Sequence, residues 1–188
     1  MKIFKWVVIV LIALILLFVF VGMPYLKKQT KKNSPEKVAT YVQDGLDIQV
    51  KYSSPFKKGR VIFGGLVPFD AVWRTGANEP TTFTTATNID ILGNQLTPGT
   101  YAIWTIPGRD SWTVMFNSEV PDWGVTLISG GRKTTYDPET DVFQIQVPVE
   151  NLQQSLESFT IDFRESDGLF LTLGWDKTQI SIPIEPSL

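Results

Sequence analysis

The residues best suited to chemistry stand in one short block, residues 73–79, which reads Trp-Arg-Thr-Gly-Ala-Asn-Glu. An arginine beside a tryptophan can stack on the indole ring and present its planar guanidinium to a carboxylate or a phosphate. An amide and a carboxylate follow within the same block. The candidate ligand-binding residues are therefore Trp73, Arg74, Asn78 and Glu79.

Each of these residues also has a structural interpretation. Arg74 can form an internal ion pair with Glu79 or another carboxylate, since a buried arginine needs such a partner. Ion-pair networks commonly resemble functional sites, which favours this interpretation. Gly76 and Asn78 are typical of a turn that requires positive φ, and Asn78 and Glu79 can hold that turn through hydrogen bonds to the backbone.

The chain contains no cysteine and no histidine, which excludes most familiar catalytic and metal sites. Without these residues there is no thiolate nucleophile, no imidazole base and no zinc site of the usual kind. We predict no metal, no other cofactor and no assigned catalytic residue. The alternative is a hydrolase of cell-envelope substrates that uses Asp70 and Glu79 as a carboxylate pair. That signal is weak, because 19 acidic residues make some such pair inevitable.

The remaining tryptophans could provide flat surfaces for sugars. Trp112 and Trp175 stand on the apolar side of alternating segments, which predicts that both belong to the core. Trp123 lies in a long connection with Pro and Gly residues and is predicted to be exposed. Residues 129–132, Ser-Gly-Gly-Arg, are interpreted as a hairpin loop, because no strand-to-helix context for phosphate binding surrounds them.

Charge is divided unevenly along the chain. Six of the 17 basic residues lie in residues 1–32, which hold no acidic residue, so residues 33–188 carry 11 basic against 19 acidic residues, about −8. An acidic folded part argues against nucleic acid as a partner, because binding to phosphates needs a basic face.

Residues 6–26 form an uninterrupted uncharged run, and lysines stand on both sides of it. As a helix this run would span about 31 Å, enough to cross the hydrocarbon core of a bilayer. It is longer than the apolar part of a cleaved signal peptide, which is the alternative, and it lacks a small-x-small cleavage site. We predict a short basic N-terminus over residues 1–5, a transmembrane anchor over residues 6–26 and a polar linker over residues 27–37.

The orientation of this anchor does not follow from charge alone. The positive-inside rule counts more lysines after the run than before it, which would place the following domain in the cytoplasm. A single N-terminal span before a complete domain more often serves export. The two arguments conflict.

Short segments with period-two patterning predict an all-β domain over residues 38–188. Val38–Val42 and Leu46–Tyr52 indicate a hairpin around Asp44-Gly45, with a helix that starts at Ser34 as the alternative. Pro183 marks the last strand as an edge, because proline cannot donate to a ladder. The predicted fold is an antiparallel two-sheet sandwich, of which a jelly-roll is one form, and a closed barrel is less favoured.

Several motifs occur in an order typical of one family. They are Tyr52–Pro55, Lys58–Arg60, Phe63–Pro68, Val72–Glu79, Pro98–Tyr101, Thr105–Pro107, Trp112–Val114, Asn117 and Trp123-Gly124. From about residue 38 to residue 186 the chain resembles the domain of unknown function 2911 family. Phe69-Asp70 and Pro80 depart from the family pattern, which argues against Asp70 as a shared functional group.

The resemblance implies a bacterial protein without an assigned biochemical activity, in a family whose members frequently carry an export signal. We therefore expect a domain on the outer side of the cell membrane, periplasmic or extracytoplasmic. The expected function is non-catalytic binding. The expected partners are the lipid bilayer, through residues 6–26, and an unknown small molecule or envelope protein.

Overall fold

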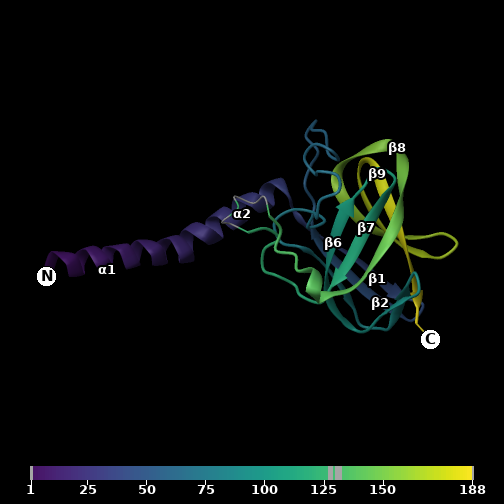
Figure 1. The fold of residues 1–188 in the computed structure, drawn as a ribbon, viewed down its shortest axis with the longest axis horizontal. Helices are drawn as coiled ribbons and strands as arrows, with labels where there is room; N and C mark the ends of the chain where they lie inside the picture. Colours follow the sequence, from purple (N-terminus) through teal and green to yellow (C-terminus); the bar gives the residue numbers. More distant parts are fainter. Residues whose placement is uncertain (1, 127–128, 130–132, 188) are drawn as a thin grey trace. The chain divides into compact units, whose positions relative to one another are not determined.

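The computed structural model describes residues 2–126, 129 and 133–187. The chain forms two compact units, Met1–Asn33 and Ser34–Leu188. The first is helical and the second is built from β-strands (Figure 1).

The helical unit is one continuous segment with a wider turn in its middle. It consists of α1 (Lys2–Leu17), the π-helical turn η1 (Phe18–Gly22) and α2 (Met23–Asn33). The Met23 N–H donates to the Phe18 carbonyl, which is the wide spacing of a π-helix. Pro24 has no N–H and its ring clashes with the preceding turn, which explains the widening. The helix continues through residues 27–33, where the sequence indicates a polar linker.

This helix is long and apolar enough to cross a membrane. The candidate span is Phe4–Asn33, and the side chains of residues 4–21 are exposed. A signal sequence near the N-terminus meets the same criteria of length and composition. The finding is thus an N-terminal apolar helix that could act as an anchor or as a signal sequence.

The β unit is mostly one antiparallel sheet. Its strands are β1 (Glu36–Gln43), β2 (Leu46–Ser53), β3 (Thr81–Thr85), β4 (Ile89–Ile91), β5 (Asn94–Leu96), β6 (Gly99–Pro107), β7 (Ser111–Asn117), β8 (Asp141–Glu165) and β9 (Leu169–Pro186). They are ordered β1-β2-β3-β6-β7-β8-β9-β4-β5. The predicted all-β class is confirmed, whereas the predicted division into two sheets is not, because all nine strands belong to one open sheet.

The two longest strands explain this difference. β8 pairs with β7 through residues 141–148 and with β9 through residues 149–165, so one strand joins two parts of the sheet. Irregular pairing between Asn151 and Thr160 lets β8 change direction, as bulges do. The sequence alternates in four shorter segments, residues 143–149, 159–163, 169–175 and 180–184, which the structure joins into the two strands β8 and β9. The order β8-β9-β4 places β9 inside the sheet and corrects the prediction that it is an edge strand. Pro183 itself lies between the residues that pair with β8 and those that pair with β4, where no ladder hydrogen bond is required of it.

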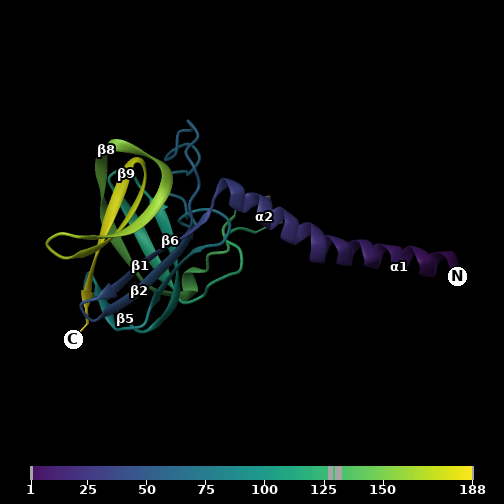
Figure 2. The same cartoon turned by 180° about the vertical axis from the view of Figure 1, so that it is seen from behind.

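The curved sheet brings its first strands against the far part of β8. The Tyr52 hydroxyl donates to the Ile161 carbonyl at 3.1 Å, and the rings of Tyr41 and Phe163 lie 5.7 Å apart. Both views show the strands arranged around a common interior (Figures 1 and 2). Aromatic and aliphatic side chains from all parts of the sheet fill this interior as one core cluster.

The first hairpin follows the prediction. β1 pairs with β2 in register, and no helix begins at Ser34. Asp44 and Gly45 have φ of 53° and 79°, the left-handed pair that a tight hairpin turn requires. A second tight turn joins β4 and β5 at Leu92-Gly93, where φ is 52° and 80°.

A smaller core lies on the opposite face of β6 and β7. Ala102, Trp104 and Met115 form it, and Val72, Ile106 and Tyr136 pack against it. Trp104 and Met115 face each other in the register of the two strands. Residues from before β3 and from the long connection after β7 therefore cover this side of the sheet.

Candidate functional site

The block of residues 73–79 leads into β3 and is hydrogen-bonded to β6 at its beginning. Trp73 and Thr105 exchange backbone hydrogen bonds of 2.7 and 3.0 Å, which fix the beginning of the block to β6. Gly76 and Asn78 have φ of 145° and 60°, as predicted for the turn. Thr75 also has a positive φ, 55°, which is unfavourable for a β-branched residue. Its hydroxyl lies 3.1 Å from the Thr105 hydroxyl, so the strained turn is anchored to β6.

Trp73 belongs to the main core. Its ring stacks on Trp175 with centroids 6.2 Å apart and contacts Phe159 at 5.0 Å. Its indole N–H donates to the Gly76 carbonyl at 3.0 Å, which ties the ring to the turn. Trp112 and Trp175 are fully buried, as the sequence predicts. Packing and a hydrogen bond therefore fix the Trp73 ring in place.

Arg74 is partly buried and lacks the ion pair that the sequence suggests. Its Nε is buried without a hydrogen-bond partner among the described residues. Within that part of the chain no carboxylate pairs with Arg74, so the pair with Glu79 is not formed. Burial lowers the pKa of the Arg74 guanidinium, because desolvation penalises the charged form. An uncompensated cation of this kind is costly for a folded domain.

Asn78 supplies a second buried donor, and its backbone, like the Arg74 side chain, contacts Gly124. Only 8% of the residue is exposed, and its Nδ2 has no hydrogen-bond partner in the described ranges. The Asn78 carbonyl accepts a hydrogen bond of 3.1 Å from the Gly124 N–H. Gly124 also contacts Arg74 so closely that an added Cβ would lie 2.4 Å from the arginine Cδ. Gly124 thus allows the long connection to approach both residues.

A cavity of about 360 Å³ adjoins the Arg74 side chain. Its lining residues are Leu66, Val67, Pro68, Ala71, Val72, Trp73, Arg74, Val125 and Thr134. We call it the Arg74 cavity. Of the four predicted ligand-binding residues, the structure places Trp73 and Arg74 on this cavity, whereas Asn78 and Glu79 are not among its lining residues.

The long connection between β7 and β8 forms one wall of the Arg74 cavity. Val125 and Thr134 are bridge partners, and the Thr126 N–H donates to the Lys133 carbonyl at 2.8 Å. Trp123, predicted to be exposed, is half-buried here. Residues 130–132 of the predicted hairpin loop lie outside the described residues. Sequence reasoning missed Val125 and Thr134, because neither has a periodic or motif signal.

The structure gives little support to carboxylate chemistry. Asp70 is exposed, with a positive φ of 57°, and its N–H donates to the Pro107 carbonyl at 2.9 Å. Neither Asp70 nor Glu79 lines the Arg74 cavity. No cluster of three metal-ligating side chains occurs among the described residues.

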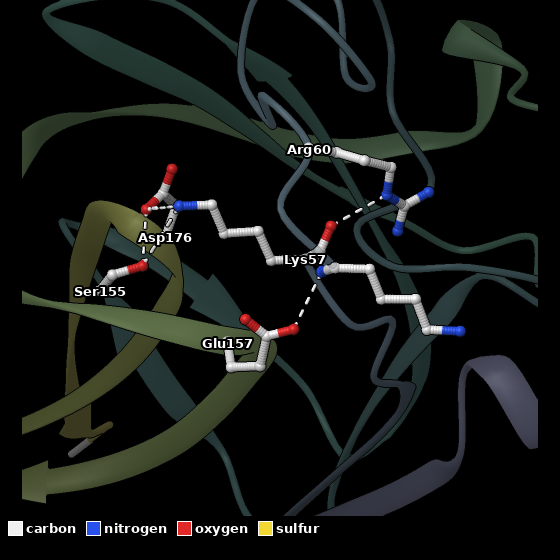
Figure 3. A network of polar contacts seen from close by, with 6 residues as sticks. Lys57, Arg60, Ser155, Glu157 and Asp176 are labelled. Carbon is white, nitrogen blue, oxygen red and sulfur yellow. Dashed lines mark hydrogen bonds and ion pairs between the residues drawn. The ribbon is translucent and has the colours of Figure 1, made fainter.

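A second polar cluster, around Lys57 and Asp176, contains a charged side chain that has a counter-ion (Figure 3). The Lys57 ammonium donates to Asp176 at 2.6 Å, and the Ser155 hydroxyl donates to the same carboxylate oxygen at 2.7 Å. The Lys57 N–H also donates to the Glu157 carbonyl at 2.6 Å. The hydrogen bond from Lys57 is the main reason that the pKa of Asp176 is lowered. This cluster fastens the segment after β2 to β8 and β9, a structural role that leaves its charges compensated.

Comparison with known proteins supports the resemblance seen in the motifs. No curated protein and no solved structure matches the chain. A family model described as Protein of unknown function (DUF2911) matches residues 34–184, which includes the block of residues 73–79 and every residue that lines the Arg74 cavity. The match covers most of the chain, and the protein therefore belongs to the DUF2911 family.

Proposed function

We propose that the protein is a membrane-tethered, non-catalytic binding module whose ligand contacts Arg74. The observation that carries this proposal is the Nε of Arg74, which is buried beside a cavity and has no hydrogen-bond partner in the described part of the chain. Burying a cation without a counter-ion costs stability, and an anionic ligand would offset that cost. Perturbed charged groups in a cleft are a recognised feature of functional sites.

Mutation of Arg74 tests this proposal. In Arg74→Met the aliphatic stem that contacts Gly124 is retained and the charge is removed. We expect the free energy of unfolding to stay within about 1 kcal/mol of the wild type or to rise, because an uncompensated charge is lost. We expect the same variant to lose the stabilisation that an anionic ligand gives the wild type. A thermal-shift screen with carboxylates, phosphates, nucleotides, sugars and metal ions measures both effects.

Arg109→Met is the matched control for that screen. Arg109 is exposed and stacks on Phe69 at 4.7 Å, but it does not line the Arg74 cavity. The control makes the same change of charge and should keep the ligand response. A ligand response that is equal in Arg74→Met and in the wild type would contradict the proposal, as would a screen without any Arg74-dependent ligand.

We also propose that the tether is retained and that the β unit faces outward. The apolar helix supports a membrane segment, and the export signals common among similar proteins support the outward side. The lysine-rich flank after the helix is the opposing argument. An outward domain would meet small molecules or proteins of the cell envelope.

Single cysteines can report this topology, because the chain has none of its own. Val61 is 72% exposed, so we expect Val61→Cys to react with a membrane-impermeant maleimide in intact spheroplasts. Lys5→Cys, which precedes the uncharged run of residues 6–26, should react only after lysis, and its label should stay on a full-length chain. Labelling of Val61→Cys only after lysis would refute the outward side. A chain that has lost the Lys5→Cys label would instead show that the helix is cleaved.

A further inference from the structure

We infer that the Arg74 cavity binds a small monocarboxylate with an apolar body. This inference rests on the proposed function, since it names the class of ligand that Arg74 contacts. It follows from the charge, the walls and the size of the cavity.

Charge limits the ligand to a single negative group. Arg74 is the one charged residue among the described residues that line the cavity. Residues 33–188 as a whole are acidic, with 11 basic residues, Arg74 included, against 19 acidic residues, so a multiply charged anion would meet repulsion. A guanidinium presents a planar fork that matches the two oxygens of a carboxylate.

The walls require an apolar body. Apart from Arg74, Trp73 and Thr134, the lining residues that the structure describes are aliphatic, namely Leu66, Val67, Pro68, Ala71, Val72 and Val125. A small inorganic anion would contact Arg74 and leave this apolar surface without a partner. An alkyl or ring substituent on the carboxylate would cover it, which is favourable roughly in proportion to the area removed from water.

Size favours a small molecule over a chain segment. The volume of about 360 Å³ lies near the lower end of the range for small-molecule pockets, roughly 300–1,000 Å³. The Asn78 backbone carbonyl accepts the hydrogen bond from Gly124, which also contacts the Arg74 side chain, so the turn and the long connection are held together beside the cavity.

Calorimetric titration of residues 34–188 tests this inference. All residues of both core clusters lie in this unit, which therefore retains its complete core in isolation. The probes are hexanoate, hexan-1-ol and inorganic phosphate, each added to the wild type, Arg74→Met and Arg109→Met. Hexanoate should bind saturably to the wild type and to Arg109→Met. Hexanoate should bind Arg74→Met at least about tenfold more weakly than it binds the wild type. Hexan-1-ol should bind the wild type at least about tenfold more weakly than hexanoate does.

The outcomes separate this inference from the proposed function. Equal binding of hexanoate and hexan-1-ol would overturn it, because the carboxylate would then contribute nothing. Binding of phosphate that depends on Arg74, without binding of hexanoate, would overturn the inferred ligand class and retain the binding function. If hexanoate does not bind and no compound in the thermal-shift screen stabilises the wild type through Arg74, both the inferred ligand class and the proposed binding function are overturned.

Discussion

Trp73→Ala is expected to lower the free energy of unfolding of the β unit by about 4 kcal/mol, the usual cost of truncating a buried tryptophan. The ring contacts four other aromatic rings, those of Phe63, Trp112, Phe159 and Trp175. Its loss would leave a large void and would remove the hydrogen bond to the Gly76 carbonyl. Urea denaturation of residues 34–188, followed by circular dichroism, measures the change.

Trp123→Ala is the control for this experiment. Trp123 is half-buried and belongs to neither core cluster, so its truncation should cost much less. If Trp73→Ala instead unfolded at the same urea concentration as the wild type, the Trp73 ring would not be a core residue. Its role would then be in ligand contact, as the sequence motif suggests.

Gly76→Ala is expected to destabilise the β unit by about 3 kcal/mol, because it combines backbone strain with a steric clash. Gly76 has φ of 145°, a conformation that residues with a Cβ rarely adopt. An added Cβ would lie 2.9 Å from the Ser53 carbonyl oxygen, which belongs to β2 and has little freedom to move. The same denaturation experiment measures this cost.

Gly45→Ala separates the two contributions. Gly45 also has a positive φ, 79°, but an added Cβ at this turn would meet no atom within 4 Å. It should therefore show conformational strain alone, about 1 kcal/mol. A Gly76→Ala variant no less stable than Gly45→Ala would show that the contact with Ser53 relaxes without cost.

Local features of this fold follow from the sequence, whereas long-range features do not. The Asp44-Gly45 turn was predictable because the residues that require positive φ stand in the turn itself. The continuity of β8 was not, because it depends on pairing with β9 across the irregular residues 151–160. Those residues lack an alternating pattern, so the sequence indicates two separate strands. For the same reason a single curved sheet was predicted as two sheets.

In the candidate site, too, the local features were predictable from the sequence and the long-range contacts were not. Arg74 was identified from its neighbours in the block, and its conformation depends on the turn at Gly76 and Asn78, which was also predicted. Its surroundings were not, because Gly124 and Val125 lie about 50 residues further along the chain, and nothing in the sequence indicates that this segment approaches Arg74. The expected ion pair with Glu79 failed because proximity in sequence does not determine which way side chains point from an irregular turn.

The position of β9 has a consequence for the order of events in folding. β9 lies between β8 and β4, and it supplies Leu171, Leu173, Trp175, Ile180, Ile182 and Ile184 to the main core. The β4–β5 hairpin, synthesised much earlier, finds its place in the sheet only beside β9. Contacts between such distant residues form slowly. The core is thus incomplete until residues 169–186 have been synthesised, so the β unit can close only after nearly the whole chain is available.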